Sequence, residues 1–434
     1  MPANEMNASA WIKSPPRRKT GGIGPMAFFA FASVAVMYLV SSLMLTMLGM
    51  AYETSGGAQW QKIAPATYFA FLALLAMFAE RRNAMALLDE IIQRHKGTLV
   101  FLITWAMLFA YIVVFQGSPL TATFDSFLLP IALSIIVVRL SPAHKRSMAL
   151  FIHVFMAANA LLGIAEFGTG WRLTPIVAQG MELNSDYRSS ALLGHPLNNA
   201  LHAASYALML LLGGGRDLTS GWRAAALLLQ IFAMAVFGGR FATLLFGLFA
   251  GVIAFRHAIL LLNGRKFSVN AAAAAAFLVP VLVIGIILLV ADGFLDKFIM
   301  RFISDEGSAA SRVRMFDLIG RIPFHELLVG ADPEVVATLQ RTEGIAFGIE
   351  SFWIAFIAYY GILISLPFFI GLLTFFYDLW RATQVRAFWP ILFFLTVCST
   401  SASLSGKSTT LAQFVVMLLI LMRRAPRPRP AEAR

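Results

Sequence analysis

Long apolar runs alternate with short polar segments along almost the whole chain. Runs of about 18 or more apolar residues are long enough to cross the roughly 30 Å hydrocarbon core of a bilayer as helices. The pattern therefore predicts an all-α, polytopic integral membrane protein with about twelve transmembrane helices. The predicted spans are 26–50, 63–80, 98–116, 124–140, 147–167, 195–213, 222–238, 241–262, 270–291, 350–377, 388–404 and 408–422.

The polar segments between these runs alternate in charge. One set is rich in Lys and Arg, and the positive-inside rule assigns such segments to the cytoplasm. This set comprises 13–19, 81–96, 139–146, 216–223, 265–266, 381–386 and 423–430. We therefore expect a basic cytoplasmic tail at 1–25, a transmembrane domain at 26–422 and a second basic cytoplasmic tail at 423–434. Both termini are then inside, as an even number of spans requires.

The outward set contains two long loops, 168–194 and 292–349. A loop as long as the second one is usually functional or disordered. Its apolar patches, FDLIGRIPF and HELLVGA, favour short helices that lie on the membrane. We therefore expect a functional outward loop with short helices.

Composition excludes several classes of function. The net charge of +12 is distributed over short clusters between apolar runs, which is typical of membrane orientation and not of a nucleic-acid-binding domain. The chain has one cysteine, Cys398, so it forms no intrachain disulfide, and we expect no metal site or cofactor. The segment SGKST (405–409) resembles the end of a nucleotide-binding P-loop, but position 401 is Ser instead of Gly and no strand precedes it. We therefore set it aside.

Arginines in outward segments need an explanation, because the positive-inside rule disfavours them there. Guanidinium groups match phosphate oxygens with two parallel hydrogen bonds, so several arginines around one cavity predict a phosphate or diphosphate ligand. Anchoring to lipid headgroups is the alternative for each of them. The candidates are Arg188, Arg240, Arg312 and Arg314.

A second polar set lies at the outward ends of two predicted spans. His195, Asn198 and His202 occupy the first two turns of the span at 195–213, and Glu350 and Ser351 open the span at 350–377. Their structural alternatives are helix capping for His195, interior packing for His202, interhelical hydrogen bonding for Asn198 and a helix N-terminal carboxylate for Glu350.

These residues carry a family resemblance. The matching positions are Arg188, Gly194, Pro196 and Asn198 in the first motif, Arg240 in the second, Ser308, Arg312, Pro323 and Gly330 in the third, and Glu350, Ser351 and Gly361 in the last. The chain resembles the bacterial O-antigen ligase and polysaccharide polymerase superfamily over roughly 150–400. It departs from the family pattern at Gly239, where a Ser precedes the arginine, and at Glu350, where ligases carry His. An acid at that position resembles polymerase members.

The resemblance implies a metal-independent glycosyltransferase of the bacterial inner membrane that polymerises polyprenyl-diphosphate-linked oligosaccharides at the periplasmic face. Glu350 or His195 would then be the catalytic base. Asn198, His202 and Ser351 would contact the acceptor glycan, and the four arginines would bind the diphosphate. The lipid bilayer surrounds the chain, and a flippase, a chain-length regulator and export proteins are candidate partners. A ligase that transfers glycan to lipid A–core, a transporter and a non-catalytic assembly subunit are the alternatives.

Overall fold

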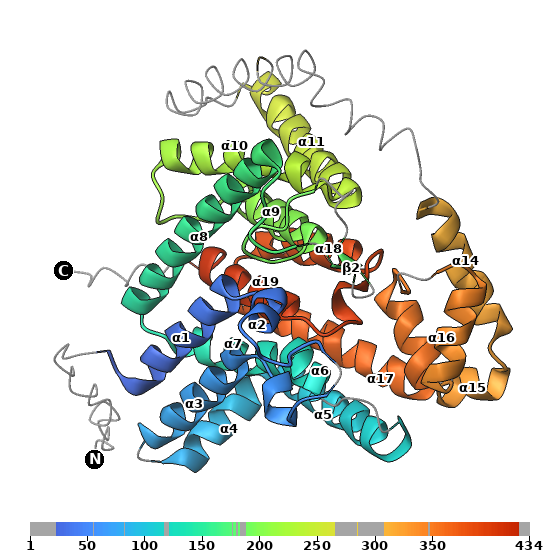
Figure 1. Cartoon of the computed structure of the whole chain (residues 1–434). Coiled ribbons are helices and arrows are strands. Elements are labelled where there is room, and N and C mark those ends of the chain that lie inside the picture. Colours follow the sequence, from blue (N-terminus) through green and yellow to red (C-terminus); the bar gives the residue numbers. More distant parts are fainter. Residues whose placement is uncertain are drawn as a thin grey trace, which may run out of the picture.

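A computed structural model of the chain describes residues 23–54, 56–81, 83–116, 121–175, 177–178, 181–182, 188–264, 284, 308–345 and 348–424. The described part is helical (Figure 1), apart from the two-residue antiparallel strands β1 (Val177–Ala178) and β2 (Met181–Glu182). Six of its helices are long and apolar enough to cross a membrane: Lys96–Gln116, Thr121–Arg139, Pro142–Thr169, Ser220–Phe237, Arg240–Leu260 and Phe352–Ala382. The fold is thus that of an all-α membrane protein.

The elements follow the chain in a simple order. The first half contains α1 (Pro25–Leu39), α2 (Ser42–Met47), η1 (Gln59–Lys62), α3 (Pro65–Ala79), α4 (Ala84–Arg94), α5 (Lys96–Tyr111), η2 (Ile112–Gln116), α6 (Thr121–Thr123), η3 (Phe124–Leu128), α7 (Leu129–Arg139), α8 (Pro142–Thr169) and α9 (Pro196–Leu211). The second half contains α10 (Ser220–Phe237), α11 (Arg240–Leu262), α14 (Ser308–Arg321), α15 (Phe324–Val329), α16 (Pro333–Thr342), α17 (Phe352–Ala382), η4 (Val385–Ala387), α18 (Phe388–Cys398), η5 (Ala402–Leu404) and α19 (Thr410–Leu421).

The predicted spans correspond to helices wherever the structure describes them, but their lengths differ. The prediction at 270–291 lies outside the described residues apart from Ile284. In the first predicted span, α1 ends at Leu39, and the side chain of Ser41 then caps α2 by accepting a hydrogen bond from the Met44 amide. With 12 residues, α19 extends about 18 Å, less than a bilayer core. The number of full spans, twelve, stays a prediction.

The short helix α19 is the centre of the molecule (Figure 1). All its residues are buried, and it packs against α7, α8 and α9. At its start, the chain between η5 and α19 lies against α1, α2 and α9. This arrangement matters for the site, because it brings three distant segments to one end of the helix bundle.

A separate lobe forms from α14, α15 and α16 (Figure 1). Its small core, with Leu318 and Val336, includes Ala358 of α17. Directly after that contact α17 breaks at Gly361 (φ 71°, ψ 168°), a conformation that favours glycine. The backbone amide of Ala331 donates to the Ala358 carbonyl, 3.1 Å away, across this junction. The predicted short helices are therefore present. Their place in a periplasmic loop stays a prediction.

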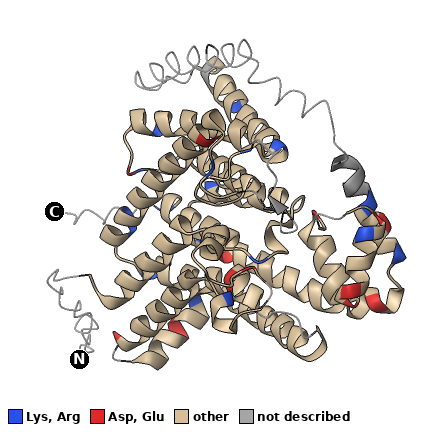
Figure 2. Cartoon of the chain, viewed as in Figure 1, with Lys and Arg blue, Asp and Glu red and all other residues tan. Residues whose placement is uncertain are grey.

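Charged residues gather in a few places on a mostly uncharged ribbon (Figure 2). Several predicted cytoplasmic segments contact one another. Arg423 pairs with Asp217 at 2.6 Å, and Arg386 donates to the Leu212 carbonyl. These segments therefore share one end of the bundle, as the alternation of charge requires. Most of the two predicted basic tails lies outside the described residues.

Candidate functional site

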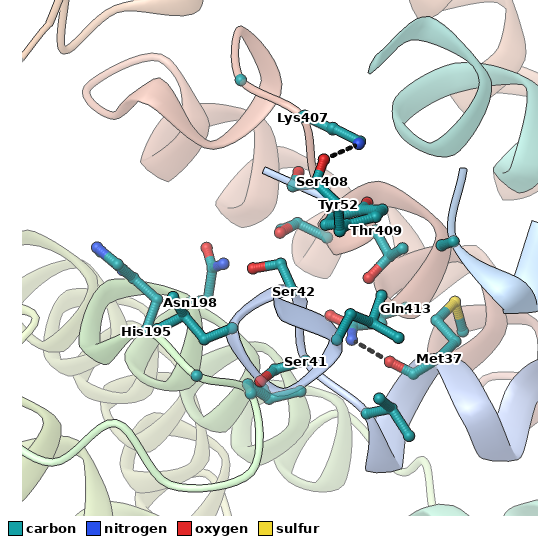
Figure 3. A pocket seen from close by; sticks show the side chains of 18 of the residues that line it. Met37, Ser41, Ser42, Tyr52, His195, Asn198, Lys407, Ser408, Thr409 and Gln413 are labelled. Atoms are coloured by element: carbon teal, nitrogen blue, oxygen red, sulfur yellow. Dashed lines mark hydrogen bonds between the residues drawn. The ribbon is translucent and has the colours of Figure 1, made fainter. Parts of the chain in front are cut away.

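A polar cavity of about 280 Å³ lies where the turn between α1 and α2, the start of α9 and the segment before α19 meet. Figure 3 shows its walls, with Ser41 and Ser42 from the first segment, His195 and Asn198 from the second, and Lys407, Ser408 and Thr409 from the third. Its volume is close to the lower end of the range for ligand-binding pockets, about 300 Å³.

The start of α9 is fixed by its own capping and by the turn next to it. His195 is the N-cap residue, and its Nδ1 accepts a hydrogen bond from the Leu197 amide at 3.3 Å. Gly194 (φ +73°) packs so closely on Ser41 that a Cβ there would lie 2.6 Å from the serine Oγ. The capping interpretation of His195 is therefore confirmed, while its ring also lines the cavity.

A buried hydrogen-bond network holds the segment before α9 against α8. Asn159 donates to Asn199 at 2.8 Å and accepts from the Leu192 amide at 3.0 Å. Glu166, buried at the end of α8, accepts from the amides of Leu173 and Ala191, both at 2.9 Å. These amide and carboxylate groups shape the backbone that leads into the cavity, so their role is structural.

Asn198 and His202 lie one helical turn apart but differ in access. Asn198 is half-buried and lines the cavity. His202 is buried beneath it, and its Nδ1 lies 2.8 Å from the Asn198 carbonyl oxygen. Of the two residues on α9 predicted to contact the glycan, Asn198 lines the cavity and His202 does not.

Arg240 is the first residue of α11 and follows a close contact between helices. A Cβ on the preceding Gly239 would overlap the Cβ of Ala200 in α9. This packing leaves no room for a side chain at position 239. It also places Arg240, which is half-buried, beside the first turns of α9. Arg188 is half-buried at the start of the segment leading to α9.

The two arginines predicted in the long loop belong to the lobe. Arg314 is exposed on α14, and its Nη1 donates to the Glu343 carbonyl at 3.3 Å. The side chain of Arg312 lies outside the described part of the structure, although its backbone belongs to α14. The structure therefore brings Arg240 to the start of α9 and assigns Arg314 to the lobe.

Glu350 and Ser351 immediately precede α17, with Glu350 half-buried and Ser351 buried. Two residues later, Trp353 donates its indole N–H to Ser399 Oγ at 2.7 Å. Ser399 ends α18, and the cavity wall begins at Ser401. The start of α17 thus packs on the segment that forms one wall of the cavity.

Sequence reasoning missed Lys407, which belongs to the discarded SGKST segment. Its Nζ donates to the Tyr52 carbonyl at 2.6 Å and lies 3.5 Å from the centroid of the Tyr52 ring. Burial lowers the pKa of Lys407 to about 8, against the opposing effect of the nearby carboxylates of Asp125 and Glu53. The available signal was a lysine in a turn predicted to face outward, the same anomaly that singled out the arginines.

Comparisons with models of protein families, with curated proteins and with solved structures give no match. Among the described residues, no group of three or more His, Cys, Asp or Glu side chains is arranged to hold a metal ion.

Proposed function

We propose that the chain is an integral membrane glycosyltransferase that polymerises oligosaccharide repeats carried on a polyprenyl diphosphate. The supporting observation is the cavity at the start of α9, whose wall includes His195, Asn198 and Lys407, in an otherwise apolar helical protein. Polar groups enclosed between membrane helices are costly unless they meet a partner or a substrate. A lipid-linked glycan has the matching chemistry, with an apolar tail, a diphosphate and a polar sugar chain.

In this proposal the arginines stabilise the leaving group. As the glycosidic bond to the donor breaks, negative charge develops on the diphosphate, and positioned guanidinium groups stabilise it without a metal. Arg188 precedes α9 in the chain, and Arg240 begins α11 where that helix packs on α9. Arg312 and Arg314 would approach from α14. The donor sugar then transfers in one displacement, which inverts the anomeric carbon.

The acceptor is a sugar hydroxyl that needs a base as it attacks the anomeric carbon. Glu350 is our first candidate and His195 the second. Asn198, Ser351 and His202 would orient the glycan, with Asn198 in direct contact through the cavity wall. The site would face the periplasm of a bacterial inner membrane, and the product would be an exopolysaccharide or O-antigen chain.

The decisive experiment supplies purified protein in nanodiscs with a polyprenyl-diphosphate-linked oligosaccharide, without nucleotide or metal. Glycan length is then resolved on a gel. We expect a ladder from the wild type and a rate lower by on the order of 10²-fold or more for Glu350→Gln, because the amide cannot accept the proton. Glu334→Gln, an exposed change on α16, is the matched control and should behave like the wild type.

The outcomes separate the alternatives. Transfer of an intact glycan to added lipid A–core, with no ladder, identifies a ligase. If the protein moves the lipid-linked glycan across the bilayer but forms no longer glycan, it is a transporter. A normal ladder from Glu350→Gln eliminates Glu350 as the base and leaves His195.

A second variant tests the leaving-group role. Arg240→Lys keeps the charge but loses the two-pronged hydrogen-bonding geometry, so we expect polymerisation to slow by on the order of 10²-fold. Arg341→Lys, an exposed change on α16, is its control. Wild-type activity in Arg240→Lys would reduce Arg240 to a headgroup anchor.

A further inference from the structure

Hydrogen bonds hold the segment that carries Lys407 against the helix Thr121–Arg139, which is long and apolar enough to cross a membrane. Ser126 lies in η3, a π-helical turn at the start of α7. Its hydroxyl donates to the Gly406 carbonyl and accepts from the Ser408 amide, both at 3.1 Å. One side chain therefore fixes the backbone on both sides of Lys407. Such π-helical turns occur often at functional sites.

The ammonium group of Lys407 is fixed as well. It contacts both the carbonyl and the ring of Tyr52. The Tyr52 hydroxyl donates to Asp125 at 2.8 Å, and the same buried carboxylate accepts from Thr67 Oγ1 at 2.6 Å and from the Ala64 amide at 3.0 Å. Three segments of the chain, at Tyr52, at Ala64–Thr67 and at Asp125, thus hold one cation at the cavity wall.

This cation is not neutralised by an ion pair. Within the described residues, Lys407 takes part in none of the ion pairs. The oxygens of Asp125 are engaged by Tyr52, Thr67 and Ala64, and Glu53 is exposed at the edge of the cavity. An ammonium carries three N–H donors, and Tyr52 uses one. Its direct contacts, the carbonyl and ring of Tyr52, are neutral, so a half-buried ammonium gains from a further anion that bonds to it directly.

Neutral hydrogen-bonding groups surround the same space. Figure 3 shows Asn198, Ser42 and Thr409 around the cavity that Lys407 borders. Oxyanions such as phosphate and carboxylate accept several hydrogen bonds at once, and hydroxyl and amide groups supply them. The cavity therefore combines one fixed positive charge with neutral donors, and the exposed carboxylate of Glu53 lies at its edge.

We propose that this cavity binds an oxyanion group of the substrate through Lys407. The group is a phosphate of the lipid-linked donor or the carboxylate of an acidic sugar in the glycan. The inference rests on the proposed function for the identity of the substrate, but anion binding itself is measurable without any turnover. In this proposal the SGKST segment forms part of the wall of an anion-binding cavity and does not bind a nucleotide.

The test is calorimetric titration of the full chain in nanodiscs with inorganic pyrophosphate, with glucuronate and with glucose. We expect an anion to bind the wild type and to bind Lys407→Gln at least tenfold more weakly. Lys407→Arg should retain binding, because it keeps the cation. Lys62→Gln is the matched control, since Lys62 lies nearby in η1 but does not line the cavity. Thermal unfolding of each variant shows whether it remains folded.

Pyrophosphate binding that depends on Lys407 identifies the phosphate source, and glucuronate binding without glucose binding identifies the sugar carboxylate. The proposal is overturned if neither pyrophosphate nor glucuronate binds, or if Lys407→Gln binds the anion with the same affinity as the wild type. If Lys407→Gln does not fold, weak binding by a folded Lys407→Arg also overturns it. Polymer formation with Lys407-independent anion binding would refute this inference alone. Lys407-dependent binding without polymer formation would refute only the proposed reaction.

Discussion

At the scale of single residues, the protonation state of Lys407 controls the proposed anion site. Burial lowers its pKa to about 8, whereas Asp125 and Glu53 raise it and Lys62 lowers it further. The ammonium is therefore mostly charged at pH 7 and mostly neutral at pH 9. We expect the affinity for sulfate, whose own charge is constant over this range, to fall about tenfold between these values. Titration calorimetry at both pH values measures it.

The guanidinium of Lys407→Arg stays charged at both pH values, so its affinity profile should be much flatter than that of the wild type. If the affinity of Lys407→Arg for sulfate falls by the same factor, a group other than Lys407 causes the pH dependence. The effect of pH on stability has the opposite sign. Because the pKa of Lys407 is lower in the folded than in the unfolded chain, the charged lysine destabilises the protein without a bound anion. Stability therefore rises with pH between about 8 and the ordinary lysine pKa of 10.5.

Residue patterns alone could identify part of this site. His195 and Asn198 stood out because polar residues at a membrane helix end are unusual, and both line the cavity. Lys407 did not, because its environment is built from Tyr52, Asp125 and Ser126, which are distant in the sequence. The SGKST segment lacks the glycine and the preceding strand of a nucleotide-binding P-loop, and its own residues give no sign of the distant groups that hold Lys407.

At the scale of elements, apolar runs predicted where helices occur but not how they end. The span predicted at 350–377 contains a break at Gly361 that becomes necessary only where the lobe packs on α17. The span predicted at 26–50 divides at Ser41, because that serine caps a new helix facing the cavity. Hydropathy averages over such positions, since each depends on a tertiary partner.

The contact between α5 and α17 provides a test of packing at this scale. A Cβ on Gly97 would overlap the backbone carbonyl oxygen of Thr374, which cannot rotate away. We expect Gly97→Ala to destabilise the protein by about 1–3 kcal/mol through overpacking. The readout is a lower midpoint of thermal unfolding in detergent.

Gly247→Ala, in α11, is the matched control. A Cβ at this position would have no neighbouring atom within 4 Å apart from the backbone of its own helix. Alanine favours helices over glycine by up to about 1 kcal/mol, so its midpoint should be unchanged or higher. Equal midpoints for the two variants would show that α5 and α17 separate more easily than this packing implies.

At the scale of the whole molecule, two polar ends define an orientation. One end gathers predicted cytoplasmic segments through Arg423, Asp217 and Arg386. The other contains the cavity, with Lys407 and the start of α9. Alternation of charge predicts that the second end faces the periplasm. The proposed reaction requires this orientation, because its lipid-linked donor is presented at that face.

Cysteine labelling tests the orientation directly. The native Cys398 is fully buried, so the wild type should react little with a membrane-impermeant maleimide and is the control. Glu334→Cys, on the exposed surface of the lobe, should be labelled in intact spheroplasts. Lys96→Cys, exposed at the start of α5, should be labelled only after the membrane is permeabilised. The reverse pattern would place the cavity in the cytoplasm and exclude a periplasmic polymerase. Labelling of both positions in intact cells would contradict the predicted topology itself.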